Sequence, residues 1–116
     1  MLRVSSQMAG TDVDLAAVNG AARTASGVEH GEELLAFTEA LMRGEAAAIE
    51  RQRLRGLLSP EAFVDVAAVV GSFNVVDRIA DATGIPLDAV LLAMSQEVRE
   101  QLELSRFASS ANTPLG

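Results

Sequence analysis

Four polar residues that could do chemistry together fall in one segment of this 116-residue chain: Asn74, Asp77, Arg78 and Asp81. In a helix they occupy successive turns of one face. An arginine there could clamp a carboxylate while an aspartate accepts a proton as a general base. The alternative is a structural ion-pair network, in which Arg78 or an Arg from a neighbouring helix or subunit separates Asp77 from Asp81. We favour the network, because nothing in the segment supplies a nucleophile or a partner that would shift a pKa.

Metal and thiol chemistry have little support in the composition. The chain has no cysteine, which removes disulfides, thiolate nucleophiles and Cys-ligated metals together. Its one histidine, His30, has Glu29, Glu32 and Glu33 around it, and such a set could bind zinc or iron. A single His among acidic residues is more often a surface residue. We therefore expect no metal and no other cofactor.

Arg51, Arg53 and Arg55 form the one basic cluster. It could bind a phosphate group or an acidic neighbour, but a solvated helix face is the interpretation that we favour. The formal net charge of −7 argues against nucleic acid or an anionic membrane as a partner, because neutralising phosphates is the main source of such affinity.

Residues 81–90 imitate a helix-turn-helix, with Gly84 in the turn. The second helix, Leu87 to Val98, contains Asp88 and Glu97 and no basic residue, so it would repel DNA phosphates. No stretch of about 18 apolar residues suggests a membrane span, and no apolar run of signal-peptide length begins the chain. We expect a cytoplasmic protein with neither nucleic acid nor membrane as a partner.

The elements that must position these residues are all predicted to be helices. The sequence shows no strand signal, so the predicted fold class is all-α, a compact bundle of four to five helices. Residues 12–106 are predicted to form a single helical domain between disordered tails at 1–11 and 107–116, which are rich in small and polar residues.

The first part of the domain contains three predicted helical segments. Residues 12–30 are predicted to be a loosely helical lead-in, in which residues 12–22 could form a short helix capped by Thr11 or Asp12. An amphipathic helix follows over 32–43, and its apolar face carries Leu34, Phe37, Thr38 and Leu41. A third helix over 45–55 is predicted to end at Gly56.

The clearest helix prediction covers Pro60 to Thr83, with Ser59 as the N-cap and Gly84 as the C-terminal stop. Its apolar residues form one stripe and part of a second face, so we expect it to be central and buried. The stripe consists of Val66, Val69, Phe73, Val76 and Ala80, and the second face of Phe63, Ala67 and Val70.

A last helix is predicted from Pro86 to about Phe107, with Arg99 and Glu103 paired on its exposed side. One face carries Leu87, Leu91, Met94, Val98 and Leu102. Together with Pro60–Thr83, this helix has more apolar surface than so small a domain can cover. We therefore expect a homo-oligomer.

Three segments of the chain resemble the carboxymuconolactone decarboxylase and alkylhydroperoxidase D-like family. They are Leu34–Leu41 (LLAFTEAL), Gly56–Glu61 (GLLSPE) and Gly71–Pro86 (GSFNVVDRIADATGIP), and they occur in family order. The resemblance covers the C-terminal half of the family pattern and lacks its Cys-x-x-Cys segment. It implies an all-helical alkylhydroperoxidase D-like half-domain that assembles into trimers or hexamers. In the family the positions of Asn74, Asp77, Arg78 and Asp81 serve bundle and subunit packing, and Asp77 stands where the family often has a second Asn.

Two functions are compatible with this resemblance. The first is a non-catalytic, oligomerising helical module that could complete a partner carrying the catalytic half. The alternative is a peroxidase-related antioxidant or decarboxylase-like enzyme that uses carboxylates and Arg78 in place of thiols. We favour the first, because sulfur nucleophilicity and reversible sulfenic chemistry are what a thiol peroxidase cycle uses.

Overall fold

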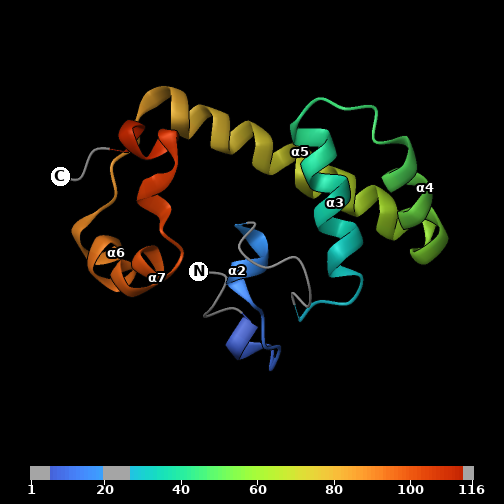
Figure 1. The fold of residues 1–116 in the computed structure, drawn as a ribbon, viewed down its shortest axis with the longest axis horizontal. Coiled ribbons are helices and arrows are strands. Elements are labelled where there is room, and N and C mark those ends of the chain that lie inside the picture. Colours follow the sequence, from blue (N-terminus) through green and yellow to red (C-terminus); the bar gives the residue numbers. More distant parts are fainter. Residues whose placement is uncertain (1–5, 20–26, 114–116) are drawn as a thin grey trace. The chain divides into compact units, whose positions relative to one another are not determined.

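The regular elements of the chain are helices throughout residues 6–19 and 27–113, the parts that the computed structural model describes (Figure 1). The all-α prediction is therefore confirmed for those residues. The elements are α2 (Leu15–Val18), α3 (Gly31–Met42), α4 (Ala48–Leu57), α5 (Pro60–Thr83), α6 (Ala89–Met94), α7 (Gln96–Gln101) and the 3-10 helices η1 (Leu104–Arg106) and η2 (Ala108–Asn112). None of the described helices is long and apolar enough to cross a bilayer.

Contacts group the chain into two units, Met1–Val70 and Gly71–Gly116. The boundary lies inside α5, which continues through it without a break. No linker separates the units, and the prediction of a single domain stays a prediction.

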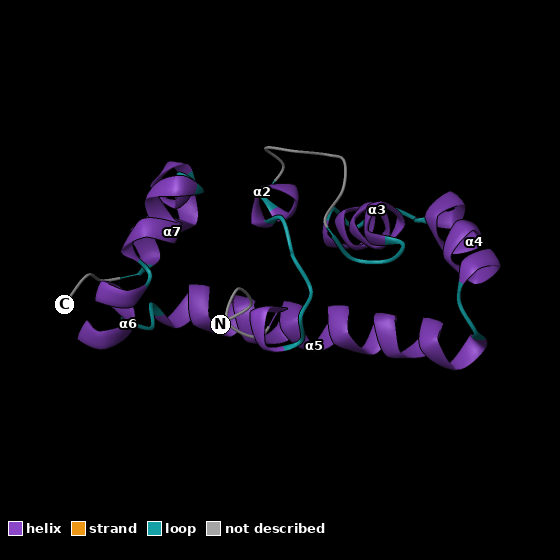
Figure 2. Ribbon diagram, turned by 90° about the horizontal axis from the view of Figure 1, so that it is seen from below, coloured by secondary structure: helices purple, strands orange, loops and turns teal. Residues whose placement is uncertain are grey.

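The core of the first unit lies between α3, α4 and the N-terminal half of α5 (Figures 1 and 2). Its buried residues are Phe37, Ala40, Ala47 and Leu54, and partly buried apolar side chains surround them. Phe63 of α5 joins this core through its ring, whose centroid is 5.7 Å from that of Phe37. This contact and the neighbouring Val66 attach α5 to the α3–α4 pair.

Helix α3 occupies nearly the predicted range, and its predicted inner face is confirmed by the burial of Phe37. Leu34, Thr38 and Leu41 are half-buried beside it. The hydroxyl of Thr38 donates to the Leu34 carbonyl at 2.8 Å, so this polar side chain is satisfied within its own helix.

Helix α4 begins and ends later than predicted. It starts at Ala48 after Ala47, whose φ of 48° interrupts the helical path, and it runs through Gly56 to Leu57. The prediction that Gly56 ends this helix is wrong. The stop comes from the following residues: Leu58 is extended, Ser59 caps α5 and Pro60 disfavours a helical conformation at the residue before it.

Helix α5 has the predicted bounds, because its end signals are local. The hydroxyl of Ser59 accepts a hydrogen bond from the Ala62 N–H at 3.1 Å. At the other end Gly84 has a φ of 66° and donates to the Ala80 carbonyl at 2.9 Å. A left-handed φ suits glycine, which has no Cβ to clash.

The predicted central position of α5 is wrong, since none of its residues is buried. Phe63 and Val66 are half-buried in the first unit, but Val69, Phe73 and Val76 of the predicted stripe are exposed. The reason is length. An α5 of 24 residues extends about 36 Å, whereas α3 with 12 residues covers about 18 Å.

The predicted helix from Pro86 to Phe107 is divided into α6, α7 and η1. Asp88 caps α6 by accepting from the Leu91 N–H at 2.8 Å, and the chain turns at Ser95. Arg99 stabilises this junction, donating to the Ser95 hydroxyl at 3.1 Å and to the Leu92 carbonyl at 2.9 Å. The predicted Arg99–Glu103 pair is wrong: Glu103 has a φ of 48° and pairs with Arg106 at 3.7 Å instead.

The two ends of the described chain also differ from expectation. Helix α2 is capped by Asp14, which accepts from the Ala16 N–H at 2.9 Å, rather than by Thr11 or Asp12. Nearby, a Cβ on Gly27 would collide with the Asp12 carbonyl, so only glycine fits there.

The rest of the predicted lead-in, residues 20–26, lies outside the described residues. At the other end, part of the predicted disordered tail forms η2.

Candidate functional site

The predicted polar cluster lies along the C-terminal half of α5. Arg78 Nε donates to Asn74 Oδ1 at 2.8 Å, one turn away. Asn74 is half-buried, whereas Asp77, Arg78 and Asp81 are exposed. The guanidinium therefore binds an amide oxygen of its own helix, and the expected contact of Arg78 with the two aspartates is absent from the ion pairs of the described residues.

Asp81 has a partner that the sequence did not indicate. Its Oδ1 accepts from Asn112 Nδ2 at 2.6 Å, across 31 positions of the chain. The contact ties η2 to the end of α5 within the second unit. Asn112 lies in the segment predicted to be a disordered tail, where no periodic pattern marks it.

The chemistry available to this cluster is that of a helix surface. Side-chain pairs one turn apart, such as Asn74 and Arg78, stabilise a helix by about 0.2–0.5 kcal/mol. Asp77, the candidate general base, is exposed, and neither of the two hydrogen bonds in the cluster involves it. These contacts align no nucleophile with a general base among the four residues.

His30 lies at the start of α3 in a left-handed conformation with a φ of 55°. Its Nε2 is 3.6 Å from Glu29 Oε1, and its side chain does not cap the helix. Within residues 6–19 and 27–113, no three His, Asp or Glu side chains come close enough together to hold a metal ion. His30 and the glutamates around it therefore do not form a ligand set.

The three arginines of the basic cluster point to different neighbours. Arg51 donates to the Ala46 carbonyl at 2.9 Å, and the Arg55 guanidinium lies 5.2 Å from the centre of the Phe63 ring. Arg53 is exposed between them. The three side chains do not converge on one site for an anion.

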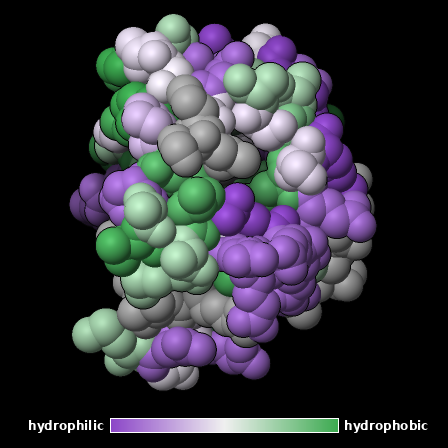
Figure 3. Space-filling view, turned by 90° about the vertical axis from the view of Figure 1, so that its left-hand side faces the viewer, coloured by the Kyte–Doolittle hydropathy of each residue, from purple (hydrophilic) through white to green (hydrophobic). Residues whose placement is uncertain are grey.

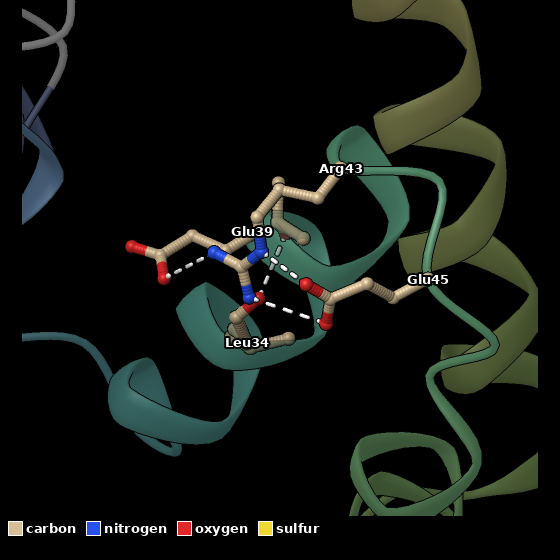
Figure 4. Close-up of polar contacts among 5 residues, drawn as sticks. Leu34, Glu39, Arg43 and Glu45 are labelled. Carbon is tan, nitrogen blue, oxygen red and sulfur yellow. Dashed lines mark hydrogen bonds and ion pairs between the residues drawn. The ribbon is translucent and has the colours of Figure 1, made fainter.

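A charged group missed by the sequence analysis lies at the end of α3 (Figure 4). Arg43 donates through Nε to Glu45 at 2.6 Å and through Nη1 to Glu39 at 3.4 Å. The hydrogen bond from Arg43 lowers the pKa of the Glu45 carboxyl, and Glu45 in turn raises the pKa of Arg43. The i, i+4 spacing of Glu39 and Arg43 was the available signal. The group joins α3 to the following turn.

The most distinctive surface of the second unit is apolar. Phe73, Val75, Val76 and Ile79, here called the α5 apolar face, lie on the side of α5 opposite to Asn74, Arg78 and Asp81. All four are exposed, Phe73 by 63% and Val76 by 60%. Ile85, Val90, Leu91 and Met94, in the following turn and α6, are exposed as well. Hydrophobic residues gather at the surface beside hydrophilic ones in Figure 3.

The chain matches no family model, no curated protein and no solved structure.

Proposed function

We propose that the chain is a non-catalytic helical module that self-associates through the α5 apolar face. The observation that carries the proposal is the exposure of that face: four large apolar side chains lie in successive turns of one helix, and all four are exposed. Soluble proteins rarely leave a contiguous apolar patch of more than a few hundred Å² uncovered. Burying such side chains contributes roughly 25 cal/mol per Å².

The amphipathic character of this half of α5 supports the proposal further. Asn74, Arg78 and Asp81 mark one polar side, and the apolar face marks the other. A helix divided in this way ordinarily places its apolar side against another element. Among the described residues no side chain of α5 is fully buried, and those of the apolar face are exposed, so a second molecule is the natural cover.

The enzyme alternative has less support. It needs Arg78 and a carboxylate to act on a substrate together, but Arg78 is bonded to Asn74 and Asp81 to Asn112. A peroxidase-related or decarboxylase-like activity therefore has no assembled group of residues to rest on.

The proposal includes the relationship that the sequence suggests. The module is a relative of carboxymuconolactone decarboxylase and alkylhydroperoxidase D-like proteins, acts in the cytoplasm and either forms a homo-oligomer or completes a partner that carries the catalytic half. The support for this part is the set of sequence segments, of which Gly71–Pro86 includes the α5 apolar face.

Light scattering on the purified chain tests self-association. At about 10 μM we expect a mass larger than the monomer, and we expect Val76→Glu to reduce it, since an unpaired carboxylate is costly in a dry interface. The matched control is Val64→Glu, the same change on the same helix at a valine that is 63% exposed. A monomeric wild-type chain would contradict the proposal, as would an equal effect of the two substitutions.

A further inference from the structure

A second exposed surface in the chain has a character complementary to the α5 apolar face. Ile49, Arg53 and Leu57 of α4 are spaced four residues apart, so they lie along one side of the helix. Ile49 is 65% exposed and Leu57 45% exposed, and Arg53 is exposed between them. We call these three residues the α4 stripe.

Arg53 differs from the other two arginines of α4. Arg51 is bonded to a backbone carbonyl and Arg55 is stacked on Phe63. Arg53 has no hydrogen bond or ion pair with another described residue. A long cation between two exposed aliphatic side chains is therefore available to a partner.

The second unit is acidic, and each of its arginines already has a partner within the unit. Its sequence has six carboxylate side chains and three arginines. Arg78 binds Asn74, Arg99 binds Ser95 and Leu92, and Arg106 pairs with Glu103. Asp77, one turn after Phe73 at the margin of the α5 apolar face, has no such partner among the described residues.

The two surfaces therefore match in polarity and in charge. Ile49 and Leu57 would cover the apolar side chains, and Arg53 would meet Asp77 at the rim, where opposite charges select the partner and its register. Two α5 helices placed face to face are a poorer match. Each carries Asp77 at the margin of the face, whereas Arg78, the one arginine of α5, lies on the opposite side and is bonded to Asn74.

We infer that the α4 stripe of one copy docks on the α5 apolar face of a second copy, with Arg53 paired to Asp77. This inference rests on the proposed self-association and names its contact surfaces. The contact is heterologous, since it joins different surfaces of identical chains. Each copy then keeps one free surface of each kind, and assembly continues until a ring closes or a filament grows.

Mixing two blocked variants tests this arrangement. Ile49→Glu blocks the α4 stripe, and Val76→Glu blocks the α5 apolar face. Each variant alone should be a monomer, and an equimolar mixture should contain a 1:1 dimer, because one intact stripe meets one intact face. Native mass spectrometry measures the masses, and circular dichroism checks that both variants keep the helicity of the wild type.

The outcomes separate this inference from the proposed function. If Ile49→Glu still assembles like the wild type while Val76→Glu is monomeric, the α5 faces pair with each other; the inference fails and the proposed function stands. If both variants are monomers and the mixture stays monomeric, the heterologous contact is also wrong. A monomeric wild-type chain would contradict both the inference and the proposed function.

A charge exchange tests the named pair. Arg53→Glu or Asp77→Arg alone should weaken assembly about tenfold, because each places like charges together at the rim. The double variant Arg53→Glu with Asp77→Arg should return to within about threefold of the wild type. Additive losses in the double variant would show that these two residues do not meet.

Discussion

The rings of Phe37 and Phe63 lie with their centroids 5.7 Å apart and their planes inclined by 52°. This tilted arrangement is favourable for two aromatic quadrupoles. Phe37 belongs to α3 and Phe63 to the first turn of α5, so the pair joins two helices that α4 separates along the chain. Beyond Val66, α5 contributes no further side chain to this core.

Truncating Phe63 should therefore destabilise the protein far more than truncating Phe73. We expect Phe63→Ala to cost about 2–4 kcal/mol, because it removes a ring that packs on Phe37 and supports Arg55. Phe73→Ala should cost less than about 1 kcal/mol, since its ring is exposed. Urea unfolding of the monomer at low protein concentration measures both. A larger cost for Phe73 would mean that α5 is covered along its whole length.

Removing the α5 cap should have a smaller, local effect. Ser59→Ala deletes the oxygen that accepts from the Ala62 N–H, and we expect a loss of about 1 kcal/mol in the free energy of unfolding. Ser72→Ala, at an exposed serine within the same helix, is the control and should have little effect. If the two changes are equal, Ser59 does not cap the helix in solution.

The bounds of α5 could be predicted from the sequence because each depends on a few adjacent residues. Ser59, Pro60 and Gly84 act through their own backbone preferences and nearest hydrogen bonds. Its burial could not be predicted in the same way. Periodicity shows that Phe73 and Val76 share a face, but the neighbour that covers a face depends on the lengths of other helices.

The candidate site also combines a local contact that the sequence predicts with a distant contact that it does not. The contact of Asn74 with Arg78 follows from helical spacing, and the sequence places the two residues together. The contact of Asp81 with Asn112 joins residues 31 positions apart, and no periodic signal connects them. Turns with a positive φ at Ala47 and Glu103 were missed for a related reason, since these residues rarely adopt that conformation.

Removing the Asn112 amide should loosen the C-terminal end of the second unit. Asn112→Ala deletes the donor to Asp81, so we expect faster amide hydrogen exchange in η2, while protection in α3 and α4 is unchanged. Ser109→Ala, in the same exposed 3-10 helix, is the control. Equal exchange rates in the wild type and in Asn112→Ala would show that the amide does not hold η2 in place.

The contact between Arg43 and Glu45 predicts a specific pH dependence. A hydrogen bond from Arg43 holds the pKa of the Glu45 carboxyl below its usual range. A carboxyl whose pKa is lower in the folded state contributes stability above its unfolded pKa, and this contribution is lost as the pH falls through the folded value. The effect on stability should be small, because both side chains are exposed and salt screens the pair.

The titration of Glu45 is a sharper measurement than the stability. Carbon NMR should show Glu45 titrating at a lower pH in the wild type than in Arg43→Gln. Identical Glu45 curves in the two proteins would mean that Arg43 does not hold this carboxylate in solution.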